Sequence, residues 1–154
     1  MKTDSPKNVD LILLADDDVD DCMFFTKAIE ELHLSVKLVS VHDGEAVMNW
    51  LNAAKNLPDI IFLDMNMPCK NGAECLAEIK AIERLKHIPI VIISTSLDEH
   101  LTKSLYESGA QWYIKKPNYF SHLKILIAHV IELVKKGNSN PTSLEKFVLT
   151  VENK

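Results

Sequence analysis

The sequence has few cysteines, no long hydrophobic run and no excess of positive charge. Its three cysteines, Cys22, Cys69 and Cys75, form no Cys-x-x-Cys pair, which argues against a disulfide framework or a zinc knuckle. Apolar runs such as 60–63 and 90–93 span four residues, whereas a membrane helix needs roughly 20. Lysine and arginine number 17 against 22 aspartates and glutamates. These absences predict a cytoplasmic protein with no membrane partner and no nucleic-acid partner.

The 154 residues are 47% hydrophobic and 25% charged, as in an average globular domain. Five short apolar segments alternate with longer segments of helical periodicity, which predicts an α/β fold with a parallel sheet and helices on both faces. The expected strands are 9–15, 36–41, 59–64, 89–94 and 111–115. The expected helices are 20–32, 44–54, 72–82, 98–107 and 120–136.

Charged and hydroxyl side chains follow several of the expected strands at their carboxyl ends, where open parallel sheets bind ligands. Asp16 and Asp17 follow the first strand, Asp64 ends the third, Ser94 ends the fourth and Lys116 follows the fifth. Crowded carboxylates repel one another unless a cation lies among them, and a set of oxygen ligands favours Mg²⁺. A lysine and a hydroxyl beside that ion would suit a phosphoryl group, with Asp64 available as the nucleophile.

Five short motifs lie in order at these strand ends. They are Leu13-Leu14-Ala15-Asp16-Asp17-Asp18, Leu63-Asp64-Met65-Asn66-Met67-Pro68, Gly72 eight residues after Asp64, Ile92-Ile93-Ser94-Thr95-Ser96, and Tyr113-Ile114-Lys115-Lys116-Pro117. With these motifs, residues 9–136 resemble the receiver domain of two-component response regulators, of the stand-alone type that accompanies phytochromes. The resemblance implies a flavodoxin-like fold with five strands in the order 2-1-3-4-5.

The resemblance also assigns roles to the acidic residues. It implies that Asp64 is the phosphoacceptor. The metal ligands would be Asp16, Asp17, Asp64 and the backbone carbonyl of Asn66, with Mg²⁺ as the cofactor.

Residues of the fourth and fifth strands would complete the site. The resemblance implies that Lys116, Ser94 and Thr95 hold the phosphoryl oxygens. Ser94 and Tyr113 would form the switch that responds to the added charge. A cis peptide bond between Lys116 and Pro117 would fix the direction of the lysine.

The expected organisation is an N-terminal arm at 1–8, the receiver domain at 9–137 and a C-terminal extension at 138–154. The expected function is a signalling switch rather than an enzyme with its own substrate. A sensor histidine kinase or histidine phosphotransfer protein would supply the phosphoryl group. A downstream protein would bind the fourth helix, fifth strand and fifth helix. The apolar stretch 144–151 suggests a homodimer, because an exposed strand-like segment tends to find a partner.

Three other functions fit parts of the pattern. A Mg²⁺-dependent aspartyl-phosphate phosphatase usually has a second aspartate two residues after its nucleophile, where this chain has Asn66. A flavin carrier needs a phosphate-binding loop after the first strand, and Asp16, Asp17 and Asp18 would repel that phosphate. An adaptor that keeps the receiver fold without being phosphorylated is the remaining alternative.

Overall fold

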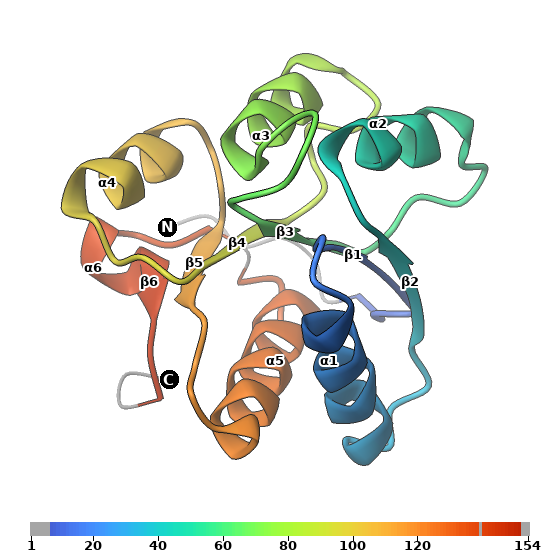
Figure 1. Cartoon of the computed structure of the whole chain (residues 1–154), viewed down its shortest axis with the longest axis vertical. Coiled ribbons are helices and arrows are strands. Elements are labelled where there is room, and N and C mark those ends of the chain that lie inside the picture. Colours follow the sequence, from blue (N-terminus) through green and yellow to red (C-terminus); the bar gives the residue numbers. More distant parts are fainter. Residues whose placement is uncertain (1–6, 139, 152–154) are drawn as a thin grey trace.

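The computed structural model describes residues 7–138 and 140–151. A central sheet lies between two layers of helices, with α1 and α5 on one face and α2, α3 and α4 on the other (Figure 1). Most of the predicted arm at 1–8, and parts of the predicted extension at 138–154, lie outside the described residues. No helix in the described ranges is long and apolar enough to cross a membrane.

The described residues form a six-stranded parallel sheet in the order β2-β1-β3-β4-β5-β6. Its strands are β1 (Leu11–Ala15), β2 (Lys37–Val41), β3 (Ile60–Asp64), β4 (Ile90–Ser94), β5 (Trp112–Lys115) and β6 (Val148–Leu149). The α/β class and the order of the first five strands are confirmed. The predicted number of five strands is wrong, because residues 148 and 149 pair in parallel with β5.

Five helices connect the strands, and a sixth precedes β6. They are α1 (Val19–Glu31), α2 (Gly44–Ala53), α3 (Gly72–Ala81), α4 (Glu99–Glu107), α5 (Phe120–Lys135) and α6 (Leu144–Phe147). Aspartate caps begin three of the longer ones, and Asn71 forms a capping box with Glu74 at α3. Short polar side chains in the loops therefore fix where these helices start.

Alternate residues of each central strand pack into two separate cores, one on each face of the sheet. Ile12 and Leu14 face α1 and α5, whereas Leu13 and Ala15 face α2 and α3. Every residue of β3 and β4 is buried, as expected of strands covered by helices above and below. The carboxyl end of β3 is thus held on both faces, which fixes the position of Asp64.

The C-terminal segment 140–151 packs against its own chain. Phe147 is fully buried in the core beneath α2, α3 and α4, and Leu149 is buried in the core beneath α1 and α5. Figure 1 shows α6 and β6 beside β5 and α4, at the end of the sheet farthest from β2. Pairing of two copies through this segment stays a prediction.

Candidate phosphoryl and metal site

Three carboxylates lie close together at the carboxyl ends of β1 and β3. Asp16 and Asp64 are 3% and 5% exposed, whereas Asp17 is exposed. One carboxylate oxygen from each of the three lies within 4.8 Å of the others. The backbone N–H of Asp18 donates to Asp16 Oδ1 at 2.9 Å, and that of Asn66 donates to Asp64 Oδ1 at 3.5 Å. The loops that follow the two strands therefore orient both buried carboxylates.

The ammonium group of Lys116 lies among these carboxylates. Its Nζ is 3.4 Å from Asp16 Oδ2 and 3.4 Å from Asp64 Oδ2. A shorter ion pair of 2.7 Å joins Lys116 to Asp21 in the first turn of α1. One cation thus contacts carboxylates from the end of β1, the end of β3 and helix α1.

Burial and crowding change the proton affinities of these groups. Burial raises the pKa of Asp16 to about 7, and the charge of Asp64 adds to that rise. Burial also raises the pKa of Asp64, although Lys116 offsets part of the effect. Burial alone would lower the pKa of Lys116, but its hydrogen bond to Asp21 and the neighbouring carboxylates raise it above the ordinary value. The site therefore holds a stable ammonium beside carboxylates that are costly to ionise together.

A divalent cation fits this donor set. Asp16, Asp17 and Asp64 offer hard oxygen atoms, and Lys116 supplies only one positive charge to the group. A bound Mg²⁺ would offset both the burial and the repulsion from Asp64 that raise the pKa of Asp16. The backbone N–H of Asn66 donates to Asp64, and the role of the Asn66 carbonyl as a metal ligand stays a prediction.

The structure separates the two hydroxyl residues of the predicted phosphoryl site. Ser94 is fully buried at the end of β4, and its Oγ accepts a hydrogen bond from the Ser96 N–H at 3.2 Å. Thr95 is exposed. Tyr113 is fully buried on β5, and its hydroxyl donates to the backbone carbonyl of Ser96. Ser94 and Tyr113 are therefore linked through one residue of the β4–α4 loop.

The predicted cis bond between Lys116 and Pro117 is wrong: all peptide bonds among the described residues are trans. The trans form of such a bond is favoured by about 0.5–1 kcal/mol. The Lys116 N–H donates to the Ser94 carbonyl at 2.7 Å, which continues the β4–β5 ladder by one residue. That bond directs the lysine toward the carboxylates from a trans backbone.

Gly72 begins α3 close to the backbone of the candidate acceptor. A Cβ atom at this position would lie 2.8 Å from the carbonyl oxygen of Asp64. The Gly72 N–H also donates to the Met65 carbonyl at 2.8 Å. The β3–α3 loop is thus folded tightly against the end of β3, and this approach leaves no room for a larger side chain.

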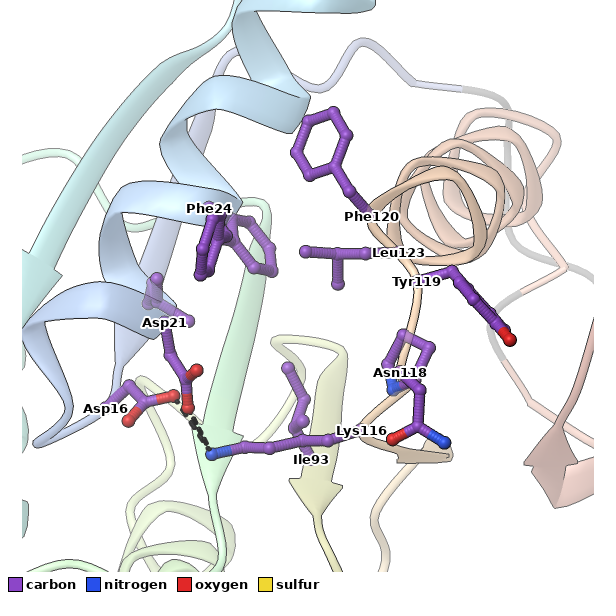
Figure 2. Close-up of a pocket in the computed structure, with 12 residues that line it drawn as sticks. Asp16, Asp21, Phe24, Ile93, Lys116, Asn118, Tyr119, Phe120 and Leu123 are labelled. Carbon is purple, nitrogen blue, oxygen red and sulfur yellow. Dashed lines mark hydrogen bonds and ion pairs between the residues drawn. The ribbon is translucent and has the colours of Figure 1, made fainter.

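A cavity of about 380 Å³ opens beside the Lys116 ammonium, between α1 and α5. Figure 2 shows Asp16, Asp21 and Lys116 at its polar end, with Phe24 and Leu123 above them. Tyr119 points away from the cavity (Figure 2). The cavity therefore leads from an apolar rim to the charged group.

Sequence reasoning assigned no role to Asp21, although this residue makes the shortest ion pair of Lys116. Its neighbour Asp20 is exposed. The sequence signal that could have identified Asp21 is its position in the helix. A helix that begins after the Asp18 cap turns residue 21 toward the site.

Residues 12–128 match the family model of the response regulator receiver domain. The fold, the three clustered carboxylates and the lysine at the end of β5 agree with that match. The chain belongs to the response regulator receiver domain family.

Within that family the chain is similar to small response regulators. It is 33% identical over 111 residues to response regulator Rcp1 of Synechocystis, covering 69% of this chain and 76% of Rcp1. It is 30% identical over 135 residues to the probable methanogenesis regulatory protein FilR2 of Methanothrix harundinacea, covering 85% of this chain and 87% of FilR2.

Two solved structures show the same likeness. The phosphorylated cyanobacterial phytochrome response regulator RcpA superposes with a TM-score of 0.75 at 32% identity, covering 82% of this chain and 94% of RcpA. The Mn²⁺-bound form of Rcp1 gives a TM-score of 0.75 at 28% identity, covering 86% of this chain and 99% of that one. A divalent metal is therefore present at least in that relative.

Proposed function

We propose that this chain is a phosphoryl-accepting signalling switch, with Asp64 as the acceptor and Mg²⁺ as the cofactor. The observation that supports it most strongly is the placement of Lys116 Nζ 3.4 Å from Asp64 Oδ2, beside the carboxylates of Asp16 and Asp17. A nucleophilic carboxylate, a fixed cation and a set of metal ligands are what phosphoryl transfer to an aspartate requires.

In the proposed reaction an oxygen of Asp64 attacks the phosphorus atom of a phosphohistidine. The new O–P bond forms as the N–P bond breaks, and the electron pair stays on the donor imidazole. Mg²⁺, held by Asp16, Asp17, Asp64 and the Asn66 carbonyl, would neutralise charge on the transferred oxygens. Lys116 would leave its ion pair with Asp64 and bind a phosphoryl oxygen. Hydrolysis of the acyl phosphate by water would restore the carboxylate.

The phosphodonor that we propose is a sensor histidine kinase or a histidine phosphotransfer protein, acting in the cytoplasm. Such a donor has to bring its imidazole over the rim of the cavity that leads to Lys116. Phe24 of α1 lines this cavity and is 53% exposed, and Val19 and Met23 of the same helix are exposed apolar side chains as well. We assign this rim as the donor docking surface, because it is apolar and the cavity behind it reaches Lys116, the ion-pair partner of Asp64.

The downstream signal would pass through protein contacts, with Ser94 and Tyr113 as the switch. Phosphorylation adds about −1.5 to −2 charges, and Lys116 and Ser94 would donate hydrogen bonds to the added oxygens. We propose that the response alters the surface of α4, β5 and α5, to which a downstream protein binds. In this role the chain converts no small-molecule substrate, and its output is the binding of a downstream protein.

The test is intact-mass spectrometry after incubation with Mg²⁺ and acetyl phosphate. We expect one phosphoryl adduct, lost with chelator and in Asp64→Asn, and retained in the exposed control variant Asp20→Asn. An adduct that survives Asp64→Asn would refute the assignment of the acceptor. A chain that binds Mg²⁺ and gains no adduct from any donor would be an adaptor that keeps the acidic site without using it.

A further inference from the structure

The C-terminal segment 143–149 packs against the edge of β5. Val148 and Leu149 pair in parallel with Tyr113 and Ile114. The Ser143 hydroxyl caps α6 by accepting from the Lys146 N–H at 3.2 Å. This segment is therefore an ordered part of the fold, held by backbone pairing and by a cap.

Phe147 anchors the segment in an aromatic cluster. Its ring centroid lies 5.2 Å from that of Tyr106 on α4 and 6.3 Å from that of Tyr113 on β5, and none of its surface is exposed. Leu105 belongs to the same apolar cluster. The segment thus covers α4 and β5, two of the three elements in the proposed output surface.

A chain of contacts joins Phe147 to the acceptor site. Phe147 packs on Tyr113, whose hydroxyl donates to the Ser96 carbonyl. The Ser96 N–H donates to Ser94 Oγ at 3.2 Å. The Ser94 carbonyl in turn accepts from the N–H of Lys116, whose ammonium reaches Asp64. A change at Asp64 can therefore reach the C-terminal segment through side chains and loop atoms already in contact.

We propose that segment 143–149 is an intramolecular ligand of the α4–β5 surface that holds Tyr113 buried, so that its docking and the phosphorylation of Asp64 favour each other. This inference rests on the proposed function, with Ser94 and Tyr113 as the switch, and it takes the buried position of Tyr113 as the one that phosphorylation favours. Phe147 fits against a buried Tyr113, so a phosphoryl group that stabilises that position also stabilises the docked segment. Thermodynamic linkage makes the effect reciprocal.

The docked segment changes the surface that a downstream protein binds. With the segment docked, the output surface is formed partly by the chain's own residues 143–149. Phosphorylation would make that composite surface more persistent. A downstream partner would accordingly bind the docked segment together with α4, rather than a bare β5 edge.

The first test is hydrogen exchange of the full chain, with and without Mg²⁺ and beryllofluoride, a stable phosphoryl mimic. We expect amide exchange of residues 147–149 to slow by about 5-fold or more in the loaded protein, within the usual range of coupling between sites. Asp64→Asn with the same reagents should show no slowing. Faster or unchanged exchange in a loaded wild-type chain would overturn the proposal.

The second test changes the C-terminal segment and measures the effect on the acceptor site. Phe147→Ala removes the anchor, whereas the control Leu144→Ala alters a side chain of α6 that is 38% exposed. Beryllofluoride affinity, followed by fluorine NMR at saturating Mg²⁺, should fall about 5-fold or more in Phe147→Ala and stay near the wild-type value in Leu144→Ala. Ser143→Ala loosens only the cap and should give a smaller loss in the same direction. Equal affinities in the wild type and both weakened variants would contradict the proposal.

The two proposals fail in different ways. If the wild type does not bind beryllofluoride at all, the proposed function fails. If it binds and the segment does not respond, only the inference fails. Light scattering at two concentrations completes the test, because a response seen only in a dimer would assign the segment to a second copy and overturn the intramolecular contact.

Discussion

Replacing the buried carboxylate of Asp16 by an amide should stabilise the metal-free protein. Asp16 is 3% exposed, and burial raises its pKa from 3.8 to about 7. The folded state therefore keeps a proton that the unfolded state has already lost between those two values. The contribution of Asp16 to stability is therefore highest below pH 3.8 and falls as pH rises toward 7, by roughly 4 kcal/mol in total.

Asp16→Asn cannot be ionised, so it avoids this loss. The amide oxygen can still accept the hydrogen bond from the Asp18 N–H, which is 2.9 Å long. The variant also gives up the 3.4 Å ion pair with Lys116, but the pKa of about 7 already includes that attraction, so no separate loss is subtracted. The net expectation at about pH 8 is a gain of up to about 4 kcal/mol in the free energy of unfolding.

Urea denaturation in the presence of chelator measures this difference. At about pH 8 Asp16→Asn should unfold at higher urea than the wild type, and near pH 4 the two curves should converge. The control Asp20→Asn changes an exposed carboxylate and should move stability by less than about 0.5 kcal/mol. A less stable Asp16→Asn at about pH 8 would refute the reasoning, because burial would then not dominate at this position.

Three further predictions concern the same site. Mg²⁺ should raise the melting temperature more at about pH 8 than at about pH 5, because at the lower pH it has to displace the proton of Asp16; an equal rise measured by scanning calorimetry would contradict this. Lys116→Met should lower the rate of phosphoryl adduct formation by on the order of 10²-fold in timed mass spectra, whereas the exposed neighbour Lys115→Met should not. Gly72→Ala should cost about 1–3 kcal/mol in urea denaturation, because the new Cβ would lie 2.8 Å from the carbonyl oxygen of Asp64; wild-type stability would show that the loop can move away.

Much of the fold could be predicted because its central strands carry simple patterns. The runs at 60–63 and 90–93 are apolar throughout, which indicates strands covered on both faces, and β3 and β4 are buried at every residue. The third expected helix, 72–82, follows the apolar spacing of Cys75 and Ile79, and α3 buries both. Local periodicity was sufficient in these segments because burial there depends on the strand or helix itself.

The sixth strand could not be predicted from periodicity. It has two residues, and two residues show no alternation. What places it is the fit of Phe147 beside Tyr106 and Tyr113, which lie 41 and 34 residues earlier in the chain. Sequence reasoning found the segment too apolar for a free end, but it had no means of choosing β5 as its partner.

Some residues of the candidate site could likewise be predicted from the sequence, and others could not. Asp16, Asp64 and Lys116 could be brought together in advance, because the carboxyl ends of neighbouring parallel strands share one edge of the sheet. Asp21 could not, because its place depends on the rotation of α1 about its axis. The trans form of the Lys116–Pro117 bond could not be predicted either, because the two isomers differ by about 1 kcal/mol and surrounding contacts decide between them.

The pairing of β6 with β5 also bears on how this protein behaves at high concentration. Without Val148 and Leu149, the backbone groups at Tyr113 and Ile114 that now pair with β6 would form an open edge in an apolar setting. Open edges of this kind are templates for edge-to-edge aggregation. At the other end of the sheet, β2 begins with the exposed Lys37, a charged residue of the kind that discourages such pairing. The last strand thus covers the backbone of Tyr113 and Ile114, which the exposed Lys115 at the end of β5 does not, so a version of the chain shortened before residue 143 would be prone to self-association.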